Sequence, residues 1–198
     1  MKIDKIQFDA IKNGLTEEQF QIHFDDKVNE IPAENVDPEA IEQHEYTKLN
    51  KQRSNRIDRT YEISREIRLA LEAIDNPQTW LVITEAWCGD SAQNLPYIQK
   101  MAATNPNITL RLLLRDQNLE IMDKYLTNST RSIPILVAFD EFGNELFRWG
   151  PRPKEAADLV KDLKSQGMEK PQFLEKLHLW YGRNRGKALE KELLHLIS

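Results

Sequence analysis

Cys88 is the single cysteine in a chain of 198 residues, and its thiol is the side chain best suited to nucleophilic chemistry. It lies in the stretch "EAWCGDSAQNLP", directly after Trp87, and Ser91 follows three residues later. A thiolate at this position could attack a disulfide and form a mixed disulfide. The Ser91 hydroxyl could donate a hydrogen bond to the thiolate, but it could not resolve that mixed disulfide. With one cysteine, any disulfide must join the chain to another molecule.

Cys88 is expected between a buried strand and a helix. The run "TWLVIT" is short, apolar and rich in residues that favour strands, as in a central strand of a sheet. Residues 89–103 are predicted to form a helix, so Cys88 lies at its N-terminus. Helix N–H groups and the helix dipole lower a thiol pKa there, whereas Glu85 and Asp90 raise it. The sequence leaves this balance open, and a lone cysteine is more commonly an inert buried side chain.

The surrounding elements are predicted from hydrophobic periodicity. Thr16 and Gln19 form a capping-box pattern at the start of a short helix over residues 15–25. The predicted strands are 79–84, 108–114, 133–139 and 145–149. The further predicted helices are 37–74, 119–126, 154–165 and 173–197. The segment "GRNRGK" interrupts the last of these helices. Strands and helices alternate at first, which predicts parallel neighbours, and "DEFGN" then closes an antiparallel hairpin.

Composition excludes several classes of function. The chain is 40% hydrophobic and 30% charged, as in ordinary globular proteins, and its net charge of −5 argues against nucleic acid as a partner. No signal-peptide pattern and no run of ~18 apolar residues is found, so we expect a cytoplasmic protein without a membrane span. The four histidines (His23, His44, His178 and His195) lack ligand spacing, which predicts no metal site and no cofactor.

The stretch "WLVITEAWCGDSAQNLPYIQKM", followed by "RSIPILVAFDEFGNELFRWG", resembles the thioredoxin-like superfamily. The resemblance implies an α/β fold with a four-stranded mixed β-sheet flanked by helices. It identifies Cys88 as the attacking cysteine, Trp87 as the tryptophan that shields it, and Gly89 as part of the active-site turn. It also identifies Ile133 and Pro134 as the isoleucine and cis-proline that face the cysteine. The long charged helix ahead of this region resembles a bacterial thioredoxin-like branch.

The resemblance is incomplete at three positions. Ser91 replaces the resolving cysteine, Asp90 replaces the usual proline, and Val82 stands where thioredoxins carry a buried acid. Glu85 is either a substitute proton acceptor or a solvent-facing loop residue. This chain therefore cannot run a dithiol cycle alone. It could form a mixed disulfide that an external thiol such as glutathione releases.

The leading hypothesis is a monothiol thiol–disulfide exchange protein organised in three parts. Residues 1–75 form a helical extension, 76–166 the thioredoxin-like domain, and 167–198 a second helical extension. The substrate would be a protein disulfide or a low-molecular-weight thiol. The catalytic residues would be Cys88 and Ser91. The substrate-binding residues would be Trp87, Gly89, Asp90, Ile133 and Pro134.

Two alternatives stay open. In the first, the scaffold is a non-catalytic binding module whose helical extensions recruit a protein partner. The basic segment "KLNKQRSNRIDR" is either a solvated helix face or a contact surface for an acidic partner. The apolar stripe of the C-terminal helix either packs on the domain or binds a partner. In the second, two chains join through a Cys88–Cys88 disulfide.

Overall fold

The computed structural model describes residues 3–30 and 37–198. The helices are α1 (Lys5–Lys12), α2 (Glu17–Asn29), α3 (Pro38–Thr60), α4 (Arg65–Glu72), α5 (Gly89–Ala102), α6 (Leu119–Met122), α7 (Lys154–Ser165), α8 (Lys170–Asn184) and α9 (Lys187–Ile197). The strands are β1 (Gln78–Thr84), β2 (Ile108–Leu114), β3 (Ile135–Asp140) and β4 (Glu145–Trp149). One turn of 3₁₀ helix, Arg115–Gln117, follows β2.

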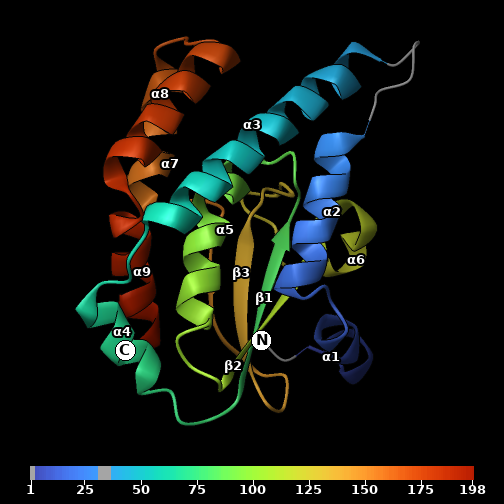
Figure 1. Ribbon diagram of the computed structural model, residues 1–198, viewed down its shortest axis with the longest axis vertical. Helices are drawn as coiled ribbons and strands as arrows, with labels where there is room; N and C mark the ends of the chain where they lie inside the picture. Colours follow the sequence, from blue (N-terminus) through green and yellow to red (C-terminus); the bar gives the residue numbers. More distant parts are fainter. Residues whose placement is uncertain (1–2, 31–36) are drawn as a thin grey trace.

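The four strands form one mixed sheet in the order β2-β1-β3-β4 (Figure 1). The two strands joined through α5 are parallel, with Val82 opposite Leu112, and β3 runs antiparallel to both β1 and β4. This confirms the predicted thioredoxin-like α/β fold with helices at both ends. β3 begins after Pro134, which has no N–H to donate to a strand ladder.

Alternate residues of the strands point to two separate cores. Trp80 and Val82 face the core formed with α2, α3, α4, α5 and α9. Leu81 and Ile83 face the opposite core, where α1 and α6 pack and where Cys88 also lies. Every residue of β1 from Thr79 onward is buried because both faces of the sheet are covered. Cys88 therefore follows a rigid central strand.

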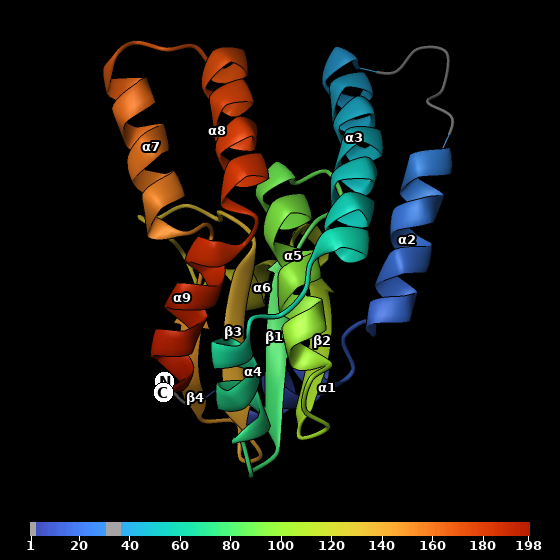
Figure 2. The ribbon, with the colours of Figure 1, turned by 60° about the vertical axis from the view of Figure 1, so that its left-hand side comes forward.

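Two pairs of helices project beyond the end of the sheet where β1 ends. Figure 2 shows α2 and α3 on one side and α7 and α8 on the other, with the start of α5 between them. α3 packs on α5, and α7 packs on α8 around Val160 and Leu177. The residues after β1 thus lie at the base of a space between α3 and α8.

Several elements match their predictions closely, and two do not. The Thr16 capping box is formed and Phe20 and Phe24 are buried, as predicted. The helix α1 was not predicted at all. The helix predicted over 37–74 is wrong as a single element, because it breaks between α3 and α4.

Tertiary hydrogen bonds explain the break between α3 and α4. The Tyr61 hydroxyl donates to Glu190 Oε1 (2.5 Å), which also accepts the Ser64 N–H (3.3 Å). Lys100 Nζ donates to the Tyr61 carbonyl (3.1 Å), and the Tyr61 ring packs edge-on against Tyr97. These partners lie on α5 and α9, so local sequence could not indicate that the helix ends here.

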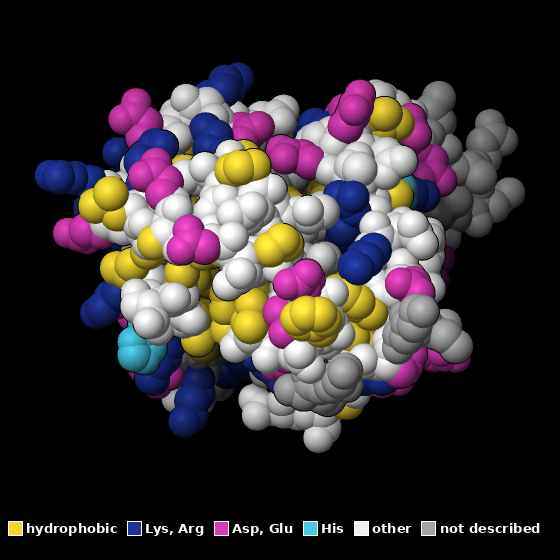
Figure 3. Space-filling model, turned by 90° about the horizontal axis from the view of Figure 1, so that it is seen from below, with side chains coloured by type: hydrophobic (Ala, Val, Ile, Leu, Met, Phe, Trp, Pro, Cys, Tyr) yellow, Lys and Arg dark blue, Asp and Glu magenta, His cyan; other side chains and the backbone are white. Residues whose placement is uncertain are grey.

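The outer surface has mixed charge. Seen from below, at the end of the sheet remote from Cys88, acidic and basic side chains are interspersed with small groups of hydrophobic ones (Figure 3). Within residues 3–30 and 37–198, no helix combines the length and the hydropathy that a membrane crossing requires.

Candidate functional site

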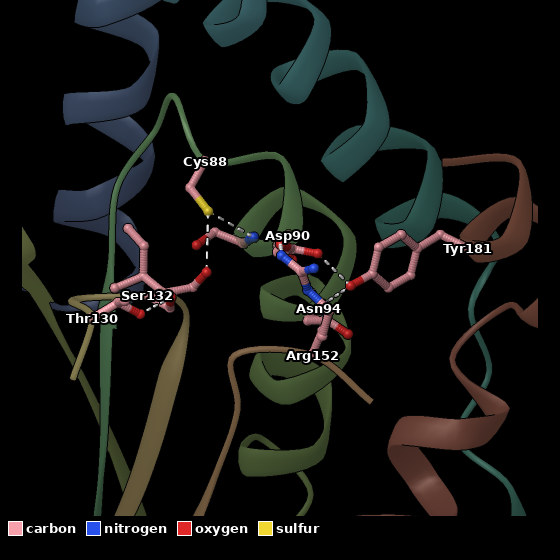
Figure 4. A network of polar contacts seen from close by, with 9 residues as sticks. Cys88, Asp90, Asn94, Thr130, Ser132, Arg152 and Tyr181 are labelled. Atoms are coloured by element: carbon pink, nitrogen blue, oxygen red, sulfur yellow. Dashed lines mark hydrogen bonds and ion pairs between the residues drawn. The ribbon is translucent and has the colours of Figure 1, made fainter. Parts of the chain in front are cut away.

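Cys88 occupies the N-cap position of α5, immediately beyond the end of β1 (Figure 4). Its Sγ donates to the Ile133 carbonyl (3.3 Å) and accepts the Ser91 N–H (3.5 Å). The residue is 8% exposed, so little of its surface meets solvent. The predicted pairing of Cys88 with the turn before Pro134 is therefore present as a direct contact.

Burial controls the acidity of this thiol. Desolvation raises the pKa of Cys88 to about 11, and the Asp90 charge acts in the same direction. The Ser91 side chain and the N–H groups at the start of α5 lower the pKa, but by less. The balance that the sequence left open thus favours the neutral thiol at physiological pH.

Ser91 lies on the first turn of α5, at the position of a resolving cysteine. Its side chain is buried, and its Oγ has no hydrogen-bond partner among the residues that the structure describes. The hydroxyl is close enough to the sulfur to favour the thiolate. It is therefore free to reorient when charge develops on Cys88.

Asp90 is the centre of a polar network that ties α5 to α8 (Figure 4). Its carboxylate accepts the Tyr181 hydroxyl at Oδ1 (2.6 Å) and pairs at Oδ2 with Arg152. Asn94 Nδ2 donates to the Tyr181 hydroxyl (3.1 Å) and to the Asp90 carbonyl (2.8 Å). Desolvation raises the pKa of Asp90 despite these partners. The network fixes the start of α5 against α8.

Gly89 is covered by His178 of α8. A Cβ on residue 89 would lie 3.0 Å from His178 Cε1, so any larger side chain would crowd the imidazole. The His178 Nδ1 lies 3.2 Å from Gln93 Nε2. Burial lowers the pKa of His178 to about 4, so the ring is neutral at physiological pH.

Glu85 and Trp87 lie in the turn between β1 and Cys88. The Arg115 guanidinium stacks over the Trp87 ring, 4.7 Å from its centroid. Glu85 is 7% exposed, and its Oε1 accepts the Asp116 N–H (2.9 Å). The solvent-facing interpretation of Glu85 is therefore wrong. Burial raises the pKa of this carboxyl.

Ile133 and Pro134 are both buried, and the peptide bond between them is cis. Gly150 lies directly behind this turn with φ of +127°, and a Cβ there would collide with the Pro134 carbonyl. Only glycine fits this conformation and this contact. The turn that faces Cys88 is thus held in place from behind by the residue that follows β4.

A cavity of about 420 Å³ lies over Cys88, between α3 and α8. Its floor is formed by Trp87, Cys88, Gly89, Asp90, Arg115 and Asp116. One wall is formed by Glu42, Gln43, Tyr46 and Arg53 of α3, and the other by Lys170, Leu174, Leu177 and His178 of α8. Two buried hydrogen bonds fix α3 over the site: Asn50 Nδ2 donates to the Ala86 carbonyl (3.2 Å), and Ser54 Oγ donates to the Ala92 carbonyl (3.3 Å).

Sequence reasoning brought together Cys88, Ser91 and the turn at Ile133, but it missed the two walls. Arg53 and His178 are far from Cys88 in the chain, and neither shows a spacing that would mark it as part of a site. Asn50 and Ser54 recur on one face of α3, which could have indicated a buried polar side of that helix. In the described part of the chain, no group of acidic, histidine or cysteine side chains is arranged to hold a metal ion.

The fold and the Cys88 site define a thioredoxin-like protein. A family model described as thioredoxin matches residues 38–164, which is more than half of the chain, so the protein belongs to the thioredoxin family. This membership supports a thiol-redox type of function in general terms. No curated protein sequence matches the chain.

Two solved structures are similar in fold. The crystal structure of an HIV epitope scaffold has 20% sequence identity and a TM-score of 0.56, with 77% of this chain and 89% of that chain covered. A protein of unknown function from Pseudomonas aeruginosa also has 20% identity, with a TM-score of 0.52. That match covers 92% of this chain and 97% of the other.

Proposed function

We propose that this protein performs thiol–disulfide exchange through Cys88 alone. The Cys88 thiolate attacks one sulfur of a disulfide, forms a mixed disulfide and expels the other half as a thiolate. An external thiol then attacks the substrate-derived sulfur of the mixed disulfide. These two sulfurs form a new disulfide, and Cys88 leaves as the reduced thiolate. Ser91 would donate its free hydroxyl to the thiolate, and Trp87, Gly89, Asp90, Ile133 and Pro134 would frame the substrate.

The observation that carries this proposal is the position of the sulfur. Cys88 Sγ lies at the N-terminus of α5, accepts the Ser91 N–H and belongs to the floor of a cavity. The raised pKa sets the expected rate. With a pKa of about 11, about one thiol in ten thousand is ionised at pH 7, so the reaction should be slow there. It should accelerate roughly tenfold per pH unit until the thiol ionises.

Adduct formation with oxidised glutathione tests the proposal. Reduced protein is incubated with the disulfide between pH 7 and pH 9, and intact mass is measured. We expect one glutathionyl group per chain, none on Cys88→Ser, and complete release by dithiothreitol. A chain that stays unmodified at pH 9, while its unfolded form reacts, would show that the thiol is not used.

A non-catalytic binding module is the second candidate, and the neutral, buried thiol favours it. In that case α3 and α8 recruit a protein partner over a thiol that is never ionised. Affinity purification with wild type and with Cys88→Ser separates the two functions. A partner that is captured equally by both favours the module. A partner that is lost on reduction, or with Cys88→Ser, favours exchange.

A disulfide between two copies of Cys88 is the least favoured arrangement. Each sulfur lies at the base of a space between α3 and α8, and each residue is 8% exposed. Two such sulfurs could meet only if the walls separated. We expect a monomeric band on non-reducing electrophoresis after air oxidation.

A further inference from the structure

We propose that the disulfide which reacts at Cys88 is a small molecule carrying a carboxylate, bound between α3 and α8, and not a segment of a protein. This inference rests on the proposed function for the exchange step. The binding of the small carboxylate can be tested without that step.

The shape of the site favours a small ligand. The cavity of about 420 Å³ falls within the range typical of small-molecule sites, roughly 300–1,000 Å³. Its walls come from two helices, α3 and α8, that both project past the end of the sheet (Figure 2). The cavity is closed on two sides, so a small molecule can enter where a folded protein surface cannot reach the sulfur.

The turn beside the sulfur is not available to an extended peptide. A bound peptide strand needs exposed N–H and C=O groups with which to pair. Ile133 and Pro134 are both buried, and the Ile133 carbonyl already accepts the Cys88 thiol. An extended protein substrate would therefore have to displace this contact before it could pair.

The acidic groups around the cavity already have partners. Asp90 is held by Arg152 and Tyr181, and Asp116 pairs with Arg115 (2.7 Å). Glu42 stands beside the Tyr46 hydroxyl and, together with burial, raises the pKa of that tyrosine. An arginine therefore compensates Asp90 and Asp116, and Glu42 is the one carboxylate of the described cavity lining that keeps its charge beside a neutral partner.

Two basic side chains on the walls are not compensated in this way. Arg53 of α3 is half-buried and donates to Asn50 Oδ1 (2.9 Å); no carboxylate of the described chain lies within ion-pair distance of it. Lys170, at the start of α8, also has no ion-pair partner among the described residues and lines the opposite wall. A desolvated guanidinium gains most from a carboxylate, which it can bind with two parallel hydrogen bonds.

His178 supplies a neutral donor next to the sulfur. Gln93 Nε2 can donate to His178 Nδ1 (3.2 Å), and this leaves the ring proton on Nε2. That nitrogen would lie 3.1 Å from a Cβ on residue 89, so it faces the cavity floor beside Cys88. The site therefore offers a cation on each wall and an uncharged donor at its base, which suits a small polar anion.

Binding of S-methylglutathione tests the occupant without thiol chemistry, because this compound has carboxylates but no free thiol or disulfide. Titration calorimetry on the full chain should detect binding. Arg53→Gln should weaken it about tenfold, the loss expected for one charge-assisted hydrogen bond. Arg56→Gln is the matched control on α3, because Arg56 lies outside this cavity. Circular dichroism confirms that both variants fold.

Reaction rates with three disulfides of different charge test whether Cys88 prefers an anionic disulfide. Oxidised glutathione is anionic, 2-hydroxyethyl disulfide is neutral and cystamine is cationic. Relative to unfolded protein, Cys88 should react fastest with the anionic disulfide and slowest with the cationic one. Arg53→Gln should reduce the preference for oxidised glutathione over the neutral disulfide about tenfold, whereas the control Arg56→Gln should keep the wild-type preference.

The outcomes separate the two proposals. Binding of S-methylglutathione by a chain whose thiol never reacts would overturn the exchange function and support the small anionic occupant. Equal rates with all three disulfides, without binding of S-methylglutathione, would overturn this inference and support the exchange function. Faster reduction of insulin than of oxidised glutathione would also overturn it.

Discussion

His178 of α8 lies directly over Gly89 of the Cys88 turn, and the two residues are so close that a Cβ on residue 89 would meet His178 Cε1 at 3.0 Å. This contact brings a helix near the C-terminus of the chain onto the first turn of α5. It closes one side of the cavity over Cys88, and it leaves little room for a side chain at position 89.

Gly89→Ala should therefore destabilise the protein, by about 1 kcal/mol, because the added methyl group crowds the imidazole. In a His178→Ala background the same change should be neutral or stabilising, since alanine favours a helix more than glycine does. Urea unfolding of the four proteins gives the coupling energy. Equal effects of Gly89→Ala in both backgrounds would mean that His178 does not constrain this position.

Asp90→Asn should increase the acidity of Cys88. The Asp90 charge and burial both raise the thiol pKa to about 11, so removing the charge should move the midpoint of iodoacetamide alkylation to lower pH. The variant also leaves the half-buried Arg152 without its carboxylate, which should cost about 1–3 kcal/mol of stability. Asp123→Asn is the control, because its pair with Arg131 is exposed and Asp123 is not among the groups that shift the pKa of Cys88. An unchanged alkylation midpoint would argue against the electrostatic role of Asp90.

Ser91→Cys should restore a two-cysteine site. The Ser91 N–H already contacts Cys88 Sγ, and the unpartnered hydroxyl occupies the place where a second sulfur would lie. We expect the oxidised variant to be two mass units lighter than the reduced one and to reduce insulin with dithiothreitol as electron donor. Ser91→Ala, measured in parallel, should do neither. A Ser91→Cys protein that keeps two free thiols under oxidising conditions would mean that the turn cannot bring the sulfurs together.

Glu85→Gln should change how stability depends on pH. Burial raises the pKa of Glu85, so the folded chain holds a proton that the unfolded chain releases above pH 4.5. Wild-type stability should consequently fall as the pH rises from 4.5 through the folded-state pKa. Glutamine stays neutral and can still accept the Asp116 N–H. The stability of Glu85→Gln relative to wild type should then increase from pH 4.5 to pH 7 in urea unfolding. The exposed Glu120→Gln should show no such trend.

The fold could largely be read from local patterns. The apolar run before Cys88, the capping box at Thr16 and the hairpin turn before Glu145 each depend on neighbouring residues, and each is found where it was predicted. The break between α3 and α4 was missed because Glu190 and Lys100 cause it from other elements. α1 was missed because its pattern spans only 8 residues, and its burial depends on the sheet beneath it.

The sequence by itself determined that this protein carries one cysteine, at the start of a helix, on a thioredoxin-like sheet, with serine where a resolving cysteine would stand. The single cysteine and its place at a helix start follow from residue identity and short-range periodicity, and the other two properties follow from the resemblance to thioredoxins. Only the tertiary structure decided how that sulfur behaves, because acidity and access depend on groups that are distant in the chain. Burial raises the pKa of Cys88, and α3 and α8 enclose it with Arg53 and His178.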